Sequence, residues 1–435
     1  MKANLILKPK WLVAMHPQVE ALEGQAVVIN DGIIVDVLPA DEASSTYEAD
    51  ETLELSSHVL MPGLVNAHTH SPMTLFRGMA DDLQLMTWLQ EHIWPAEQKM
   101  NEDFISVGTE LAVAEMLRSG TTCFNEHYFY PGTTAEVAIA AGMRAQIGVL
   151  ALDVPTPWAQ TGEESITKGL NDLERVGDYA LVTHSMAPHA PYTVSDDTFK
   201  RMMKIATDRS LTIHIHMHET QFEVDTSMKE HGKRPMQRFA DLGLLEHHMQ
   251  LVHMTALNDE DISLIKGKNC HVIHSPESNL KLASGYCPVQ KLLDAGVNVG
   301  LGTDGAASNN DLDMFGEMRT ASLIGKMVAQ DPTAVSAKDV LSMATLGSAK
   351  ALGLDDKIGS LEKNKAADMI AVDLSALNTQ PVYHPISHLV YAVNSQQVTD
   401  VWVAGQRVLK DTTLTTIDTN VLIEEVGTWK AKIVS

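Results

Sequence analysis

The chain of 435 residues is poor in cysteine and in basic residues, and each shortage argues against a class of protein. Its three cysteines, Cys123, Cys270 and Cys287, lie far apart and form no CxxC pair. This argues against a disulfide framework or a thiolate zinc site and favours a reducing, cytoplasmic environment. With 32 basic against 56 acidic residues, the formal net charge is −24. Such a surface repels polyanions, so we expect neither nucleic acid nor an anionic membrane as a partner.

Long apolar runs are also missing. No segment approaches the ~18 consecutive apolar residues of a membrane span, and Lys8 and Lys10 interrupt any apolar signal-peptide core near the N-terminus. The composition is otherwise that of a globular protein, with 44% hydrophobic and 20% charged residues. Its length suits one barrel of about 250 residues with additions.

The two ends of the chain resemble each other and differ from the middle. Residues 26–38 form two β-rich runs around an Asn-Asp-Gly turn, which predicts a hairpin. Residues 367–374 and 401–409 repeat this pattern near the other end. Because short hairpins are marginally stable alone, we expect residues 1–58 and 365–435 to combine into one small β-sandwich domain.

Between these ends, residues 59–364 alternate apolar strand-like runs with amphipathic helical stretches. One predicted helix covers residues 103–119, with Asn101 as its N-cap and Gly120 closing it. Such alternation predicts a parallel sheet, and eight units predict a closed (β/α)8 barrel. An open, doubly wound sheet is the alternative, but its glycine-rich phosphate turn is missing. The eight predicted strands are 59–68, 121–127, 144–152, 181–189, 211–219, 250–254, 270–275 and 297–304.

Histidines gather at the ends of these strands. His68 and His70 end the first strand, and residues two apart on a strand point to the same face. The fifth strand places His214, His216 and His218 on one face. A lone histidine would more often be a core residue, but several buried imidazoles need hydrogen bonds or a metal.

Carboxylates accompany the histidines. Glu219 follows the fifth strand, His253 ends the sixth, and Asp304 ends the eighth. The carboxyl ends of barrel strands form one mouth, so these side chains should converge. Taken alone, Asp304 reads more readily as a helix N-cap. Imidazole and carboxylate ligands with one open position are typical of a catalytic zinc or a similar divalent ion, so the sequence predicts a metal site.

Several of these segments together resemble the amidohydrolase superfamily. They are the sequence PGLVNAHTH at 62–70, the pair His216 and Glu219, His253, and LGTD at 301–304, with further likeness at 274–285, 302–310 and 314–319. Within the superfamily the chain is similar to the branch of methylthioadenosine/S-adenosylhomocysteine deaminases, guanine-type deaminases and s-triazine hydrolases. The resemblance covers nearly the whole chain.

The resemblance implies a role for each matching residue. It makes His68, His70, His216 and Asp304 the metal ligands, and leaves His214 and His218 as supporting or structural residues. Catalysis would rest on Glu219 as the proton shuttle, on His253 as a base beside the attacking water, and on Asp304 as the acceptor of its proton. Substrate contacts would come from Trp88, Glu97, His189, Glu219 and Asp304. Without the resemblance, Glu97 reads as a solvated helix acid, and Trp88 reads equally well as a core anchor.

The resemblance also bears on the number of ions. Members of the superfamily that hold two metals use a bridging lysine on the fourth strand, and residues 181–189 contain no lysine. We therefore expect one Zn²⁺ per subunit, although Fe²⁺ or Mn²⁺ suits the same kind of donors.

The implied activity is hydrolytic deamination of an adenine nucleoside to its inosine form and ammonia. Some relatives hold the carboxylate of S-adenosylhomocysteine with an arginine, and residues 145–174 contain none. This favours 5'-methylthioadenosine, with S-adenosylhomocysteine or adenosine as further candidates. The alternatives are a deaminase of guanine or 8-oxoguanine, an s-triazine chlorohydrolase, and a non-catalytic binding protein on the same barrel. Glu97 separates these classes, because a bare base or a triazine has no ribose to read. A homodimer or a higher homo-oligomer is expected, and the dimer is favoured because it is the commonest assembly.

Overall fold

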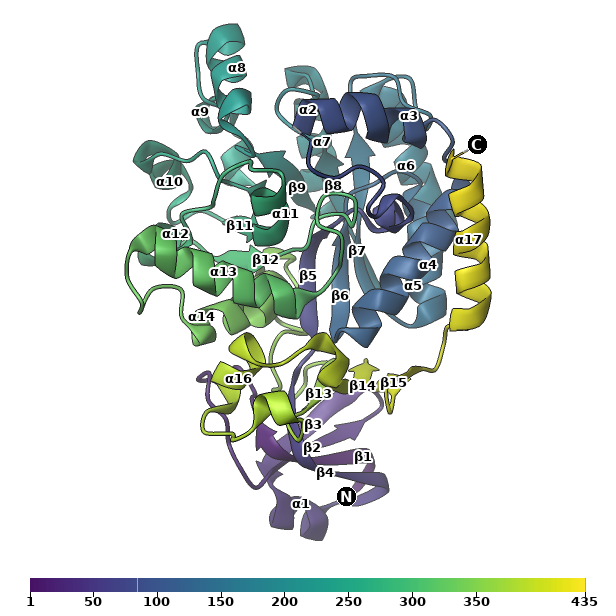
Figure 1. Ribbon diagram of the computed structural model, residues 1–435, viewed down its shortest axis with the longest axis vertical. Helices are drawn as coiled ribbons and strands as arrows, with labels where there is room; N and C mark the ends of the chain where they lie inside the picture. Colours follow the sequence, from purple (N-terminus) through teal and green to yellow (C-terminus); the bar gives the residue numbers. More distant parts are fainter. Residues whose placement is uncertain (84, 435) are drawn as a thin grey trace.

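The fold, given by a computed structural model, is described for residues 1–83 and 85–434. Two sheets of eight strands each organise it (Figure 1). One sheet is built from strands of both chain ends, and the other from strands in the middle of the chain. The two sheets correspond to the two patterns that the sequence predicted.

The second sheet is a (β/α)8 barrel, which confirms the predicted fold class. Its strands are parallel and are hydrogen-bonded in sequence order. They are β5 (Leu64–Thr69), β6 (Thr121–Glu126), β7 (Arg144–Ala151), β8 (Val182–Pro188), β9 (Thr212–Met217), β10 (Met249–His253), β11 (Cys270–His274) and β12 (Val299–Leu301).

The first and last strands of the barrel, β5 and β12, meet near their carboxyl ends. The backbone N–H of Asp304 donates to the carbonyl of His68 at 3.0 Å. A Cβ atom at Gly302 would lie 2.7 Å from the backbone nitrogen of His68, so this approach requires glycine. The closing contact therefore places Asp304 directly beside the first histidine pair.

Helices fill the gaps between the strands. The predicted helix at 103–119 forms as α4 (Glu102–Arg118), where the Asn101 side chain accepts from Phe104 N at 3.0 Å. The barrel helices and their extensions are α4, α5 (Pro131–Ala141), α6 (Gly162–Val176), α7 (Asp196–Arg209), α8 (Gln221–His231), α9 (Pro235–Asp241), α10 (Asp259–Ile265), α11 (Pro276–Lys281), α12 (Val289–Asp294), α13 (Met314–Ala329), α14 (Ala337–Ser342) and α15 (Ser348–Ala351).

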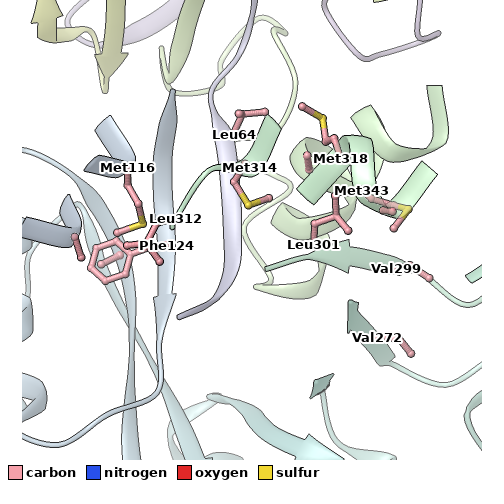
Figure 2. Close-up of a cluster of buried hydrophobic side chains, with 14 of the residues drawn as sticks. Leu64, Met116, Phe124, Val272, Val299, Leu301, Leu312, Met314, Met318 and Met343 are labelled. Carbon is pink, nitrogen blue, oxygen red and sulfur yellow. The ribbon is translucent and has the colours of Figure 1, made fainter. Parts of the chain in front are cut away.

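The main core lies between the barrel strands and these helices. Figure 2 shows part of it, where Leu64, Phe124 and Leu301 of three strands lie near Met116 of α4 and Met314 of α13. All five side chains are buried. Close packing of this kind holds the strands, and hence their carboxyl ends, at fixed positions.

Strands from both chain ends form the other sheet, as predicted. The parallel pair β1–β4 and the antiparallel pair β4–β13 join the two ends into one continuous sheet. The hairpin predicted at 26–38 is present as β2 and β3. In spatial order the strands are β16 (Thr413–Leu414), β15 (Gln406–Lys410), β14 (Val398–Val403), β13 (Met369–Asp373), β4 (Glu48–Pro62), β1 (Lys2–Leu12), β2 (Gln25–Asn30) and β3 (Ile33–Pro39).

The remaining helices surround this sheet and the barrel mouth. The C-terminal helix returns to the barrel beside α4 (Figure 1), where the ring of Trp429 lies 5.4 Å from that of Phe104. No helix within residues 1–83 and 85–434 is long and apolar enough to cross a membrane. These helices are α1 (Ala40–Thr46), α2 (Leu85–Trp88), α3 (Trp94–Glu97), α16 (Pro385–Tyr391) and α17 (Thr419–Val434).

The first predicted strand, residues 59–68, is wrong as a single strand. Residues 59–62 end β4 and pair with β13 in the terminal sheet, and β5 begins only at Leu64. The change falls at Gly63, where a Cβ atom would lie 2.1 Å from the Thr122 side chain. The amino end of β5 therefore adjoins the terminal sheet, and its carboxyl end, with His68, points away from it. The division of the chain into separately folding domains stays a prediction.

Candidate metal centre and active site

The four side chains that are predicted to bind the metal meet at the carboxyl end of the barrel. His68 lies near the end of β5 and His70 directly follows that strand, while His216 comes from β9 and Asp304 from the turn after β12. The Nε2 atom of His216 lies 3.3 Å from Nε2 of both His68 and His70. Oδ1 of Asp304 also lies 3.3 Å from each of the latter two atoms.

These separations test whether the four side chains suit a metal ion. Two ligand atoms about 2.0 Å from a zinc ion, at the tetrahedral angle, lie about 3.3 Å from each other. All four of the separations have this value. Three imidazoles and one carboxylate are donors suited to zinc and similar divalent ions. The residues therefore fit one such ion.

The outer ring nitrogens orient the histidines. Nδ1 of His70 donates to the carbonyl of His127 at 2.6 Å, and Nδ1 of His216 donates to the carbonyl of His189 at 2.8 Å. Since a carbonyl only accepts, each Nδ1 carries the proton and each Nε2 keeps a free lone pair. Backbone partners of this kind fix the tautomer that a metal requires.

Asp304 is held rigidly in the same centre. Its Oδ2 accepts from Ser278 at 2.7 Å and from Ser308 at 2.9 Å, and its Oδ1 accepts from Gly305 N at 2.8 Å. Its backbone is left-handed, with φ of +63°, a strained conformation often found at functional sites. The helix that follows is capped by Asp313 instead, so the N-cap interpretation of Asp304 is wrong.

Burial determines the charges of the centre. It lowers the pKa of His68 to about 4 and that of His216 well below its ordinary value, so both are neutral at neutral pH. Burial acts to raise the pKa of Asp304, but the contact with His68 and the nearby His70 hold it well below the usual range. The centre thus presents neutral imidazoles and one ionised carboxylate, which favour a cation.

Glu219 and His253 lie together beside this centre. Nε2 of His253 is 4.0 Å from Oε2 of Glu219, while its Nδ1 donates to Oδ1 of Asn279 at 2.9 Å. The ligand atoms of His253, His68 and Asp304 lie within 4.8 Å of one another. Burial raises the pKa of Glu219, and the charge of Asp304 adds to this effect, against the opposing effect of His253. A raised pKa moves a carboxyl towards the working pH at which a general acid is most effective.

The side chains of Glu223 and Thr255 hold the backbone around Glu219 by hydrogen bonds. The buried carboxylate of Glu223 accepts from the backbone nitrogens of His218 and Glu219, both at 2.9 Å. Oγ1 of Thr255 donates to the carbonyl of Glu219 at 2.6 Å. The strand has ended here, since His218 has φ of +50°. Its imidazole therefore contacts Met236 N and the Ala256 carbonyl, and is not on the face of His216 as the alternation predicted.

Glu97 is not the solvated helix acid that its local sequence suggests. It ends α3 and is partly buried, and its Oε1 accepts from the hydroxyl of Tyr128 at 2.5 Å. Burial raises the pKa of Glu97 to about 7, against the opposing effect of the Tyr128 hydrogen bond. The Tyr128 ring lies 6.1 Å from that of His70, which connects Glu97 to the metal centre.

The two other predicted substrate contacts differ in position. The His189 ring lies 5.0 Å from that of His216, and its Nδ1 is 2.9 Å from Oγ1 of Thr193. Trp88 is 6% exposed and belongs to a buried apolar cluster with Phe104 and Phe129. Its position matches the core-anchor interpretation, and a contact with substrate stays a prediction.

The sequence analysis missed His127. This residue follows β6 and is buried, and its ring stacks on that of His216 at 4.6 Å with an angle of 14°. Neither of its ring nitrogens has a hydrogen-bond partner among the residues that the structure describes. His127 ended a predicted strand, so the rule that found His68 and His253 could have found it too. His214, by contrast, was expected as a supporting residue, and its Nε2 lies 3.0 Å from Nδ1 of His68.

The barrel, its composite terminal sheet and the histidine-carboxylate centre define a hydrolase of the amidohydrolase type. The Amidohydrolase family matches residues 59–408, and the chain belongs to this family. Its members typically bind a divalent metal.

Two curated relatives match the chain over almost its whole length. A protein of Saccharophagus degradans named 5-methylthioadenosine/S-adenosylhomocysteine deaminase is 49% identical over 432 residues, covering 99% of this chain and 97% of that one. A protein of Methanosarcina mazei named 5'-deoxyadenosine deaminase is 39% identical over 432 residues, covering 97% and 96%.

Two solved structures resemble the fold. An adenosine deaminase of Xanthomonas campestris with bound zinc has a TM-score of 0.98 and 46% identity, and 99% of each chain is covered. The atrazine chlorohydrolase of Arthrobacter aurescens, complexed with zinc, has a TM-score of 0.90 and covers 98% of this chain and 100% of that one. Because the latter is 22% identical, it supports the fold alone.

Proposed function

We propose that this protein is a zinc-dependent deaminase that hydrolyses an adenine nucleoside, with 5'-methylthioadenosine as the best substrate. The observation that carries the proposal is the joint arrangement of a metal centre, a raised-pKa carboxyl at Glu219, and a partly buried carboxylate at Glu97 on one barrel mouth. Relatives at 39% to 49% identity are named as deaminases of such nucleosides, which supports the same class of substrate.

Each residue of the site has a task in this reaction. Glu219 would protonate a ring nitrogen of the purine, which makes C6 electrophilic. His253 would orient the attacking water, and Asp304 would accept its proton and later pass a proton to the departing ammonia. Glu97 would accept hydrogen bonds from the ribose hydroxyls, and His189 would contact the ribose or a ring nitrogen.

His68, His70, His216 and Asp304 would hold one divalent ion. When bound, this ion would lower the pKa of a water towards ~7, so that hydroxide is available at neutral pH. Zinc is the proposed ion because the Xanthomonas campestris structure contains it. Fe²⁺ and Mn²⁺ suit the same donors.

Removing the metal should abolish turnover and lower the melting temperature. Chelation should lower Tm because an ion that binds only the folded state stabilises that state. The stabilisation is about 4 kcal/mol when the concentration of the free ion is 1,000 times its Kd. The measurement is metal analysis with a thermal melt before and after chelation, and after zinc is restored. We expect one ion per chain, and none in His216→Ala. Full activity in a protein shown to be free of metal would contradict the proposal.

The KM should depend on pH through Glu97. Its pKa of about 7 means that it is charged above this pH and neutral below it. A neutral carboxyl accepts hydrogen bonds more weakly, so KM should rise about tenfold between about pH 8 and pH 6. Steady-state kinetics across this range measures the effect. In the Glu97→Gln variant, KM should not change with pH. A variant that keeps the pH dependence of the wild type would contradict the assignment.

The surroundings of Glu97 favour a 5' group without charge. The apolar cluster around Tyr128 includes Leu150, and Leu152 and Trp158 pack against it. The one lysine of α6, Lys168, contacts Glu164 and the Trp158 carbonyl. Placing a free carboxylate in such surroundings costs free energy, which favours methylthioadenosine over S-adenosylhomocysteine.

The proposed function is tested by following the ultraviolet spectrum of methylthioadenosine with zinc-loaded protein. Conversion to the inosine form would support it, and comparison with S-adenosylhomocysteine and adenosine would rank the substrates. Turnover of guanine, 8-oxoguanine or a chlorotriazine, with no turnover of nucleosides, would replace it with the corresponding alternative. Metal-loaded protein that turns over none of these compounds would favour a binding role.

A further inference from the structure

The Glu97 carboxylate has one hydrogen-bond partner among the residues that the structure describes, the hydroxyl of Tyr128. The two residues are 31 positions apart, Glu97 at the end of α3 and Tyr128 just after β6. No lysine or arginine within residues 1–83 and 85–434 forms an ion pair with Glu97. A carboxylate held in a partly buried place by a single phenol depends on that phenol for its orientation.

Tyr128 is itself fixed in place. It is 4% exposed, and its ring packs edge-on against those of Phe129 at 5.0 Å and His70 at 6.1 Å. His70 is a proposed metal ligand, so the position of the Tyr128 hydroxyl is tied to the metal centre. The hydroxyl in turn fixes Oε1 of Glu97, which leaves Oε2 to accept from a ligand.

We propose that Tyr128 is a positioning residue that makes the site selective for nucleosides with an intact ribose diol, by holding Glu97 in the orientation that accepts from it. The phenol uses its one donor on Glu97, so the pair presents acceptors to a ligand. Acceptors match the two hydroxyl donors of a diol. The inference rests on the proposed function, and it adds the residue on which the orientation of Glu97 depends.

The same acceptors would also suit an ammonium group, such as the amine of a homocysteine chain. 2',3'-Dideoxyadenosine distinguishes a site for the diol from a site for an ammonium group, because it lacks both hydroxyls and keeps the purine. S-adenosylhomocysteine carries both groups, so it is excluded from this comparison. Adenosine and its dideoxy form therefore serve as the matched pair of substrates.

The test is steady-state kinetics of Tyr128→Phe with these two substrates. Loss of a hydrogen bond that orients a charged group should raise KM for adenosine about tenfold and leave kcat within about twofold. For 2',3'-dideoxyadenosine, KM should already be high in the wild type and should change by less than about twofold in the variant. A merely structural defect would raise KM for both substrates or lower kcat.

Tyr130→Phe is the matched control. Tyr130 lies two residues further along, where its ring packs at 4.4 Å on that of Trp158, and its hydroxyl donates no hydrogen bond to Glu97. This control should leave both KM values unchanged. Metal content and Tm of each variant show whether the fold is kept.

A second variant keeps the inference testable if Tyr128→Phe folds poorly. Glu97→Gln should raise KM for adenosine and spare the dideoxy form, and adding Tyr128→Phe to it should have little further effect, because Tyr128 acts through Glu97. Equal KM increases for both substrates, or additive effects in the double variant, would overturn the inference while leaving the deaminase standing. Failure of the wild type to deaminate any nucleoside would overturn the proposed function, and this inference with it.

Discussion

Glu219→Gln is expected to lower kcat by about 10²- to 10⁴-fold, the range that a positioned general acid or base contributes. Glutamine keeps the size of the side chain and can still contact His253, but it has no proton to give to the purine ring. Burial raises the pKa of Glu219, and the lost function is the delivery of that proton. The measurement is kcat for methylthioadenosine with zinc-loaded protein.

Two controls make this result specific. Metal content should be unchanged, because Glu219 is not among the four side chains that meet at 3.3 Å. Glu246→Gln is the matched variant, since Glu246 is exposed and pairs with Lys268 on the surface. It should leave kcat within about twofold. A Glu219→Gln protein that keeps its metal and retains most of its kcat would remove Glu219 from the mechanism.

Asp368→Ala should destabilise the protein by about 3–5 kcal/mol, the cost of leaving a buried charge without its partner. Nε of Arg144 donates to Oδ2 of Asp368 at 2.8 Å, and Nη2 donates to Oδ1 at 3.0 Å. Arg144 is 5% and Asp368 is 3% exposed. Arg144 begins β7 of the barrel, and Asp368 precedes β13 of the terminal sheet and also accepts from Ala404 N at 2.8 Å. The ion pair of Arg144 and Asp368 therefore links the barrel to the terminal sheet.

The free energy of unfolding in urea measures the effect. Arg144→Met combined with Asp368→Leu should recover most of the loss, since an apolar pair of similar volume replaces a buried ion pair at little net cost. Asp208→Ala is the surface control, because Asp208 and Lys204 form an exposed pair worth about 0–1 kcal/mol. An Asp368→Ala protein within about 1 kcal/mol of the wild type would show that the pair does not hold the sheets together.

The sequence by itself determined the barrel and the place of the site. Strand and helix periods are local, so residues 121–127 and 144–152 were recognisable from their own side chains and form β6 and β7. The two-residue spacing of His68 and His70 fixes their common face, because side chains alternate along a strand. The parallel order of the strands then brings His216 and Asp304 to the same mouth.

Only the tertiary structure decided which neighbours each side chain has. Spacing placed His218 on the face of His216, but the strand ends before it and its left-handed backbone turns the ring to Met236. The local sequence of Glu97, without the family resemblance, indicates a solvated helix acid, whereas its carboxylate is partly buried and accepts from the hydroxyl of a tyrosine 31 residues away. The physical reason is common to both: a period describes one element, whereas burial and hydrogen bonding depend on segments distant in the chain, which only packing brings together.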